Sequence, residues 1–237
     1  MKEQHNPGSA SKSAAETEVL SESLTIQIPA GEVTLTGDLE IPEDARGLVL
    51  FAHGSGSSRA SPRNQAVAEV LSEAGLGTLL FDLLTSEEEA VGNYTAHLRF
   101  DIGLLSRRLA MVTEAIADDR RSRNLGIGYF GASTGSAAAL RAAAALRSLV
   151  GAVVSRGGRP DLAGDALTIV KAPTLLIVGE RDEEVLRLNE STYARLQCEK
   201  SLAVVPRATH LFQESGALEE VARLAAEWFR KHLRPRK

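Results

Sequence analysis

The spacing of hydrophobic residues changes along the chain in a way that predicts a β-sheet covered by helices. Near the N-terminus, residues 24–28 and 33–39 alternate apolar and polar positions, and residues 29–32 between them favour a hairpin connection. Further on, short continuous apolar runs indicate strands buried on both faces. These runs cover residues 47–52, 77–81, 125–130, 150–154, 174–178 and 202–205. Together, the segments predict an eight-stranded sheet.

Helix-forming segments separate most of these runs. Ser61-Pro62 favours a helix start and Gly75 a helix end, because serine and proline suit a first turn and glycine suits the backbone that follows a last one. A longer helix is predicted by an apolar stripe with spacings of three and four residues: Leu98, Ile102, Leu105, Leu109, Val112 and Ile116. A small-residue helix over about 133–146 and an amphipathic C-terminal helix complete the pattern.

The alternation of strand and helix after the first hairpin predicts one α/β domain at residues 21–237. Its sheet should be mostly parallel, with helices on both faces. Residues 1–20 lack apolar periodicity and are expected to form a disordered tail. Residues 155–173 are too few to fold as a lid with its own core, so no cap domain is expected between the runs on either side.

Composition narrows the class of protein. The formal net charge is −4, and no basic stripe alternates with aromatic residues, which argues against a nucleic-acid surface. The single cysteine, Cys198, excludes an intrachain disulfide. The sequence shows no membrane span, signal peptide or metal-binding motif, so we expect a cytoplasmic hydrophilic protein without a metal or cofactor. Its oligomeric state is left open between monomer and homodimer.

One motif with candidate chemistry follows a buried run. Gly131-Ala132-Ser133-Thr134-Gly135 matches G-x-S-x-G and lies between a predicted strand and a helix of small residues. Such an elbow holds its serine in a strained turn, and Gly131 and Gly135 let strand and helix approach each other. We interpret Ser133 as a nucleophile and the backbone N–H of Thr134 as an oxyanion donor. The alternative is that Ser133 only caps the helix.

A serine hydroxyl needs a base, usually a histidine. Four of the five histidines fit this role poorly by position: His5, His53, His97 and His232. We expect His53 to brace the loop after its strand instead. His210 directly follows the last predicted strand, and its loop should share the sheet edge of the elbow, where ligands bind open α/β sheets. We therefore interpret His210 as the general base, with a role near a helix cap as the alternative.

The acid that orients the base is expected between the serine and the histidine in the chain. Asp182 follows the run at 174–178 and leaves room for one strand–helix unit on each side. Its role would be to fix the tautomer of His210 and to stabilise the imidazolium without taking the proton. The nearby acidic competitors are Glu180, Glu183 and Glu184.

The loop after residues 47–52 offers a second oxyanion donor. Gly54 and Gly56 free the main chain around Ser55, so we expect the backbone N–H of Ser55 to point inward. The alternative is a flexible surface loop without a polar role.

Two roles are possible for the charged side chains that are expected at the same edge of the sheet. We expect four loop arginines to brace the loops through backbone carbonyls: Arg59, Arg63, Arg156 and Arg159. The alternative is a rim that attracts an anionic substrate, for which Arg59 and Arg156 are the candidates. The run Glu87–Glu89 either gates the pocket or belongs to a solvated loop, which we expect.

These pieces together resemble the dienelactone-hydrolase-like branch of the α/β-hydrolase superfamily. The resemblance covers about residues 24–233 and rests on five stretches. They are HGSGSSRASPRN at 53–64, GTLLFDLLTSEEE at 77–89, GYFGASTGSAAAL at 128–140, GERDEEV at 179–185 and ATHLF at 208–212. The resemblance implies the α/β-hydrolase fold and a cofactor-free esterase, with Ser133, Asp182 and His210 in the triad positions.

Two departures bear on the substrate. Dienelactone hydrolases proper carry a cysteine nucleophile and a glutamate in the loop after the first HG turn. This chain has Ser133 and a loop of serines and glycines instead. We therefore expect a serine hydrolase of small carboxylesters or lactones that works through an acyl-enzyme. The alternatives are a non-catalytic binding protein of this fold, or a hydrolase of amides or phosphotriesters.

Overall fold

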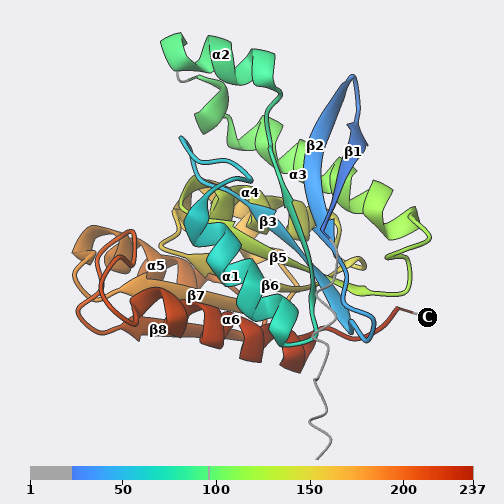
Figure 1. Cartoon of the computed structure of the whole chain (residues 1–237). Helices are drawn as coiled ribbons and strands as arrows, with labels where there is room; N and C mark the ends of the chain where they lie inside the picture. Colours follow the sequence, from blue (N-terminus) through green and yellow to red (C-terminus); the bar gives the residue numbers. More distant parts are fainter. Residues whose placement is uncertain (1–22, 96, 237) are drawn as a thin grey trace, which may run out of the picture.

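The structure, a computed structural model, describes residues 23–95 and 97–236, so the predicted tail at 1–20 lies outside the described residues. Its centre is one eight-stranded sheet with the order β1-β2-β4-β3-β5-β6-β7-β8 (Figure 1). The strands are β1 (Leu24–Ala30), β2 (Val33–Glu40), β3 (Gly47–Ala52), β4 (Gly77–Phe81), β5 (Gly126–Ala132), β6 (Val150–Arg156), β7 (Thr174–Gly179) and β8 (Lys200–Val205). This confirms the predicted eight-stranded sheet.

Antiparallel pairing occurs only on the two sides of β2, with β1 and with β4, within the described sheet. β1 and β2 form a hairpin, and Gly31 in its turn has a positive φ of 75°, which glycine adopts without strain. β2 also runs antiparallel to β4. From β4 onward, the successive pairs β4–β3, β3–β5, β5–β6, β6–β7 and β7–β8 are all parallel. The carboxyl ends of the parallel strands therefore meet at one edge, where ligands bind such sheets.

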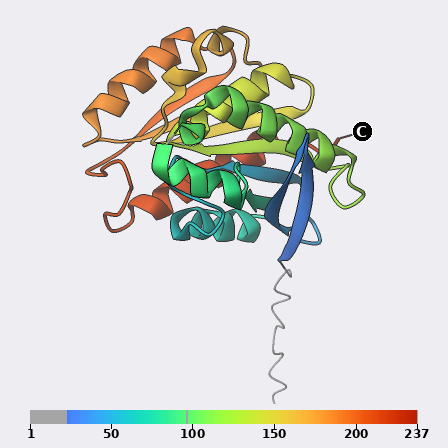
Figure 2. The ribbon, with the colours of Figure 1, turned by 90° about the horizontal axis from the view of Figure 1, so that it is seen from above.

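Helices cover both faces of the sheet. The helices are α1 (Pro62–Glu73), α2 (Ser86–Thr95), α3 (Ile102–Asp118), α4 (Thr134–Ala145), α5 (Glu183–Arg195) and α6 (Ala217–His232). α1 and α6 pack on one face, and α3, α4 and α5 lie on the other (Figure 2). No helix within the described part of the chain is both long and apolar enough to cross a membrane.

Two predictions about helices were wrong in detail. The long helix begins at Ile102 and not at Leu98, because the side chain of Asp101 accepts a hydrogen bond from the backbone N–H of Leu104 and caps the first turn. Residues 98–100 form a short 3₁₀ turn before that cap. The acidic run Glu87–Glu89, expected in a solvated loop, forms the first turn of α2.

The sequence held a signal for α2 that our interpretation missed. Thr85 and Glu88 have the spacing of a capping box, in which each side chain bonds the other residue's backbone. The structure contains both bonds, from Thr85 N–H to Glu88 Oε2 at 2.9 Å and from Glu88 N–H to Thr85 Oγ1 at 3.3 Å.

The segment between β6 and β7 is short, as predicted. It contains one 3₁₀ element, η2 (Pro160–Thr168), which bends at Gly164 with a φ of 62°. η2 packs against α4 and α5 and has no core of its own, so residues 155–173 form no cap domain.

Candidate active site

Ser133 lies on a sharp turn between β5 and α4. Its φ of 50° and ψ of −123° are unfavourable for a residue with a side chain, and such strain persists only where the surroundings enforce it. The backbone supplies that constraint. The N–H of Ser133 donates to Arg156 O at 3.3 Å, and its carbonyl accepts from Arg159 N–H at 3.0 Å. The neighbouring strand and the loop after it therefore hold Ser133 in place.

The two elbow glycines fill the positions where a side chain would collide. A Cβ on Gly131 would lie 2.6 Å from the Cα of Ser136, and one on Gly135 would overlap the carbonyl of Ala52. Gly54 is a third such position, because a Cβ there would lie 2.9 Å from the Cβ of Ser133. Glycine is thus required for β3, β5 and α4 to meet at this turn.

Asp182 and His210 come together from the ends of adjacent strands. His210 Nδ1 lies 2.6 Å from Asp182 Oδ2, and the Asp182 side chain is 15% exposed against 41% for His210. Asp182 follows β7 and precedes α5, whereas His210 follows β8. The competing glutamates are not at His210; Glu180, for example, accepts from the N–H of Arg207. The contact leaves Nε2 as the second ring nitrogen of His210 available for a proton transfer.

One loop joins this pair to the elbow. Gly157 follows Arg156, whose carbonyl binds Ser133, and a Cβ on Gly157 would lie 3.1 Å from the carbonyl oxygen of His210. Within the described residues, the Ser133 hydroxyl makes no hydrogen bond, to His210 or to any other group. Contacts of this kind often tighten only when a substrate binds.

The backbone donors near Ser133 differ from our expectation in one respect. Thr134 opens α4, so its N–H has no intrahelical acceptor and lies beside the serine. The N–H of Ser55, however, donates to the Thr134 hydroxyl at 2.9 Å. The N–H of Ser55 thus points toward the elbow but is occupied by a side chain in this structure, and its role as an oxyanion donor stays a prediction.

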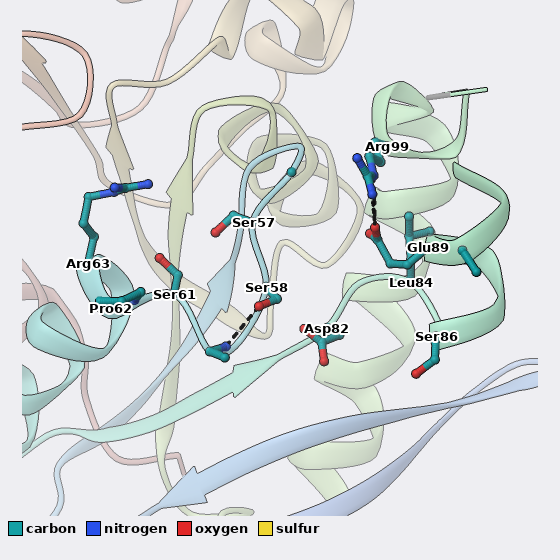
Figure 3. Close-up of a pocket in the computed structure, with 13 residues that line it drawn as sticks. Ser57, Ser58, Ser61, Pro62, Arg63, Asp82, Leu84, Ser86, Glu89 and Arg99 are labelled. Atoms are coloured by element: carbon teal, nitrogen blue, oxygen red, sulfur yellow. Dashed lines mark hydrogen bonds and ion pairs between the residues drawn. The ribbon is translucent and has the colours of Figure 1, made fainter. Parts of the chain in front are cut away.

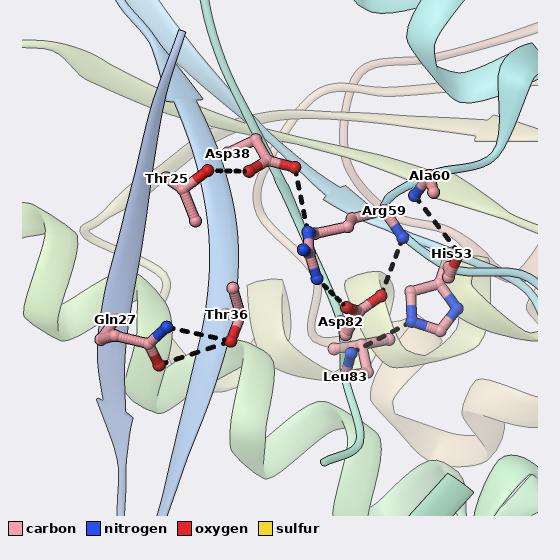
Figure 4. Close-up of polar contacts among 10 residues, drawn as sticks. Thr25, Gln27, Thr36, Asp38, His53, Arg59, Ala60, Asp82 and Leu83 are labelled. Atoms are coloured by element: carbon pink, nitrogen blue, oxygen red, sulfur yellow. Dashed lines mark hydrogen bonds and ion pairs between the residues drawn. The ribbon is translucent and has the colours of Figure 1, made fainter. Parts of the chain in front are cut away.

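His53 braces its loop, as we expected. Its Nε2 accepts a hydrogen bond from Leu83 N–H at 3.1 Å, which leaves the proton on Nδ1, 3.0 Å from Gly54 O (Figure 4). The ring is buried, and burial lowers the pKa of His53, so it stays neutral. The interaction ties the loop after β3 to the loop after β4.

Arg59 was also a candidate for a substrate rim, but carboxylates occupy its guanidinium group. It lies 3.0 Å from Asp38 and 2.7 Å from Asp82, and its backbone N–H also binds Asp82 at 2.8 Å (Figure 4). These contacts fit the expected bracing of the loop by Arg59, and a role at a substrate rim stays a prediction. Asp38 comes from β2, so this cluster fastens the loop after β3 to the first hairpin.

Arg156 is not an exposed rim residue either. It ends β6 and is only 8% exposed, and its Nε and Nη1 atoms are buried without a hydrogen-bond partner. Burial, and then repulsion from Arg63, lowers the pKa of Arg156 to about 10. The group therefore stays charged at neutral pH.

A cavity of about 840 Å³ opens beside the elbow. One side is formed by the loop after β3 and the start of α1, and the opposite side by α2 together with Arg99 (Figure 3). A small adjoining pocket contains Gly54, which lies against Ser133, and shares Leu84 and Arg99 with the cavity. The cavity thus leads toward the candidate nucleophile, and much of its lining is polar.

α2 is held over this cavity by ion pairs that our sequence reasoning missed. Arg108 of α3 binds both carboxylate oxygens of Glu88 at 2.5 Å and also donates to Leu83 O at 3.0 Å. Glu89 pairs with Arg99 at 2.6 Å. No group of three or more potential metal ligands gathers anywhere in residues 23–95 and 97–236.

The sheet order, the elbow serine and the Asp182–His210 pair define an α/β-hydrolase fold with a hydrolase-type site. The chain belongs to the dienelactone hydrolase family of that superfamily. It is 57% identical to a dienelactone hydrolase from Anabaena variabilis, and the two structures superpose with a TM-score of 0.89 over 90% of this chain and 99% of that one.

Two further comparisons limit what the relationship shows. The chain is 58% identical over 208 residues to a protein of Mycobacterium tuberculosis, in two strains, that is provisionally named a phosphoribosyl transferase. The match covers 88% of this chain but only 46% of that protein, so the chain spans about half the length of these curated relatives. Est1E from Butyrivibrio proteoclasticus shares the fold at 17% identity and a TM-score of 0.73, over 87% and 98% of the two chains. No family model matches the chain.

Proposed function

We propose that this chain is a serine hydrolase that cleaves small carboxylesters or lactones through an acyl-enzyme. The observation that carries the proposal is the strained Ser133, held at the end of β5 at the same sheet edge as the Asp182–His210 pair. Membership in the dienelactone hydrolase family supports it.

The roles follow from the geometry. Ser133 Oγ attacks the ester carbonyl while His210 Nε2 takes its proton, and the same proton then goes to the leaving alkoxide. Asp182 holds Nδ1 of His210 and stabilises the imidazolium through the 2.6 Å contact. Water, deprotonated by His210, then attacks the acyl-enzyme and releases the acid and Ser133.

The negative charge of the tetrahedral intermediate needs donors beside Ser133. The N–H of Thr134 is the first, supported by the positive end of the α4 dipole. The Ser55 N–H would serve as the second only after it leaves the Thr134 hydroxyl. Reorientation of the Thr134 hydroxyl on substrate binding would free it.

The provisional transferase name of the mycobacterial relatives does not change this proposal. Those proteins are more than twice as long as the matched region, and we assign the named activity to the part that this chain does not match. Hydrolysis of amides or phosphotriesters uses the same groups and is the remaining alternative within the enzyme class.

The test separates an enzyme from a binding protein of the same fold. A fluorophosphonate probe should label the wild-type chain at Ser133 alone, and Ser133→Ala should lose labelling together with hydrolysis of p-nitrophenyl acetate. Ser57→Ala, in the loop after β3, is the matched serine control. Loss of less than tenfold in kcat/KM for Ser133→Ala would exclude this nucleophile, and an unlabelled, inactive wild type would favour the binding protein.

A further inference from the structure

The loop between β6 and η2, residues 157–159, contacts the elbow through its backbone. The carbonyl of Ser133 accepts a hydrogen bond from the N–H of Arg159 at 3.0 Å. The N–H of Ser133 donates to the carbonyl of Arg156, the residue just before this loop, at 3.3 Å. The unfavourable φ of Ser133, 50°, therefore depends on where the loop lies. A displacement of the loop would move the candidate nucleophile.

The same loop also contacts the candidate base. A Cβ on Gly157 would lie 3.1 Å from the carbonyl oxygen of His210 and 3.6 Å from its Nδ1, so the backbone of Gly157 lies directly against the histidine. The N–H of Gly157 donates to the carbonyl of Ile177 in β7 at 2.8 Å, which fastens this end of the loop to the sheet. The loop thus contacts both Ser133 and His210, and its position determines how the two residues lie relative to each other.

Gly158, the middle residue of the loop, is packed tightly against β6 and α4. A Cβ on Gly158 would overlap the hydroxyl oxygens of Ser155 and Ser136. Ser136 belongs to the first turn of α4, and its hydroxyl donates to the carbonyl of Gly131 at 2.9 Å. The loop is therefore supported by the same backbone that leads into Ser133.

One buried side chain of α5 also holds Gly158. The amide nitrogen Nδ2 of Asn189 donates to the carbonyl of Gly158 at 3.0 Å and to the carbonyl of Val185, one turn earlier in α5, at 2.8 Å. Asn189 is completely buried, with 0% exposure, and its Oδ1 has no hydrogen-bond partner among the described residues. Burying an amide is costly unless it is hydrogen-bonded, so the two bonds of Nδ2 orient this side chain.

α5 is also the helix that follows the candidate acid. Asp182 is its N-cap residue, and the N–H of Leu186 donates to the carbonyl of Asp182 at 2.8 Å. Asn189 lies about two turns further along the same helix. The bond from Asn189 to Gly158 therefore ties the helix that begins at Asp182 to the loop that holds Ser133. One buried amide joins the two halves of the candidate site.

We propose that Asn189 is a positioning residue: its hydrogen bond to Gly158 sets the position of Ser133 relative to the Asp182–His210 pair. Because Asn189 is fully buried, it acts through the loop and not on the substrate. This inference rests on the proposed function, because the relative position affects a rate only if Ser133 is the nucleophile. A misplacement of about 1 Å caused by a change far from the chemistry can lower a rate by about 100-fold.

The first experiment measures the chemistry of each active site. Asn189→Leu keeps a side chain of similar size and removes the bond to Gly158, and Asn189→Ser is a smaller second variant in case leucine prevents folding. Active sites are counted by complete labelling with a fluorophosphonate, so unfolded protein does not contribute. For each titrated site, kcat on p-nitrophenyl acetate should fall by about 10- to 100-fold, with KM changed by less than about twofold. The rate of labelling at saturating fluorophosphonate should fall by a similar factor, because it uses the same nucleophile and base.

Thr192→Val is the matched control. Thr192 lies on α5 one turn after Asn189, it is 1% exposed, and its hydroxyl has no hydrogen-bond partner among the described residues. Valine has nearly the same shape as threonine, so this variant changes a buried polar group of the same helix without touching the loop. Its kcat and its labelling rate should equal those of wild type.

The second experiment requires no activity. Hydrogen exchange of backbone amides is followed by mass spectrometry in wild type, Asn189→Leu and Thr192→Val. Loss of the bond to Gly158 should speed exchange by about tenfold in the peptides that contain the amides of Ser133 and Arg159, because the loop would open more often. The hairpin of β1 and β2 should exchange at the wild-type rate, which separates a local effect from a general loss of stability.

The outcomes separate this inference from the proposed function. Slower chemistry at each titrated site together with faster exchange in the loop supports a positioning role for Asn189. An unchanged kcat for each site, even with fewer active sites or a lower melting temperature, overturns it, because Asn189 would then contribute only to stability. A rise in KM without a fall in kcat also overturns it. If wild type is neither labelled nor active, the proposed function fails; faster exchange would then still support the link from Asn189 to the elbow, and unchanged exchange would overturn that link.

Discussion

Two regions of the molecule differ in how the charges of their arginines are neutralised. On the side of β2, β4 and α2, every arginine described above has a carboxylate: Arg59 with Asp38 and Asp82, Arg99 with Glu89, and Arg108 with Glu88. On the side of α1 and β6, Arg63 and Arg156 have none among the described residues. The paired charges fasten loops and α2 in place, whereas the guanidinium of Arg156 is buried without a counter-charge among the described residues.

The Asp182–His210 pair is a third case, because its proposed role is in catalysis and not in holding a loop. Asp182→Asn should lower kcat by about 10⁴-fold, because the amide no longer stabilises the imidazolium or fixes its tautomer. The melting temperature should change little. Steady-state kinetics on p-nitrophenyl acetate measures the effect, with Glu183→Gln as the control. A near-wild-type Asp182→Asn beside an inactive Glu183→Gln would show that the acid is misassigned.

Removing an ion pair that holds α2 should lower the stability of the protein. Arg108→Met removes a side chain that is 7% exposed and leaves Glu88, at 25%, without its partner. Because loss of one partner of a buried pair costs 3–5 kcal/mol and Glu88 is partly solvated, we expect a loss of about 2–3 kcal/mol in the free energy of unfolding. Denaturant titration at pH 7 measures it. Arg121→Gln, which breaks an exposed pair, should cost less than about 1 kcal/mol.

The ion pair between Arg108 and Glu88 also predicts that the stability of the protein depends on pH. Hydrogen bonds from Arg108 lower the pKa of Glu88 below its ordinary value of 4.5. A carboxyl with a lowered folded pKa stabilises the protein above the unfolded pKa, and this contribution disappears as pH falls through the folded pKa. The difference in the free energy of unfolding between wild type and Arg108→Met should therefore become smaller below about pH 4.5. If this difference in the free energy of unfolding stays constant down to pH 3, the destabilisation of Arg108→Met comes from lost packing alone.

Because the lining of the cavity mixes polar and apolar groups, it should limit the length of the neutral acyl chains that the protein hydrolyses well. A deep apolar pocket gains about 0.8 kcal/mol for each buried methylene, but this cavity is lined by serines and charged groups as well as Leu84 and Ala90. We expect kcat/KM to be highest for acetyl to butyryl esters and roughly tenfold lower for octanoyl. A p-nitrophenyl ester series tests this. A steady rise to dodecanoyl esters would indicate a lipase-like site instead.

The smallest expected effect is on the unpaired side. Arg156→Met keeps an unbranched apolar stem and removes a buried charge that lacks a partner, so it should raise the melting temperature in phosphate-free buffer. Each kcal/mol corresponds to about 2–4 °C for a chain of this size. Calorimetric melts measure the change. A lower melting temperature for Arg156→Met would mean that the guanidinium packs favourably although it has no counter-charge.

Much of the fold and part of the candidate site could be predicted from local pattern. Strand–helix alternation indicated the sheet, and G-x-S-x-G indicated the turn at Ser133, because both depend on residues adjacent in the chain. The positions of Asp182 and His210 followed from chain order, since loops after parallel strands meet at one edge. α2 was missed although Thr85 and Glu88 carried its capping-box spacing.

The tertiary structure alone decided which polar groups meet. The partners of Arg59 are Asp38 and Asp82, which are 21 and 23 residues away in the chain, and nothing local distinguished Arg59 from Arg63. Likewise, the N–H of Ser55 donates a hydrogen bond to the hydroxyl of Thr134, which is 79 residues later in the chain. The sequence by itself determined the order of the elements and the edge where the candidate groups gather, because periodicity and turn chemistry are local. Burial and charge pairing depend on distant segments packed side by side, so only the folded chain separates an arginine that braces a loop from one that is buried without a partner.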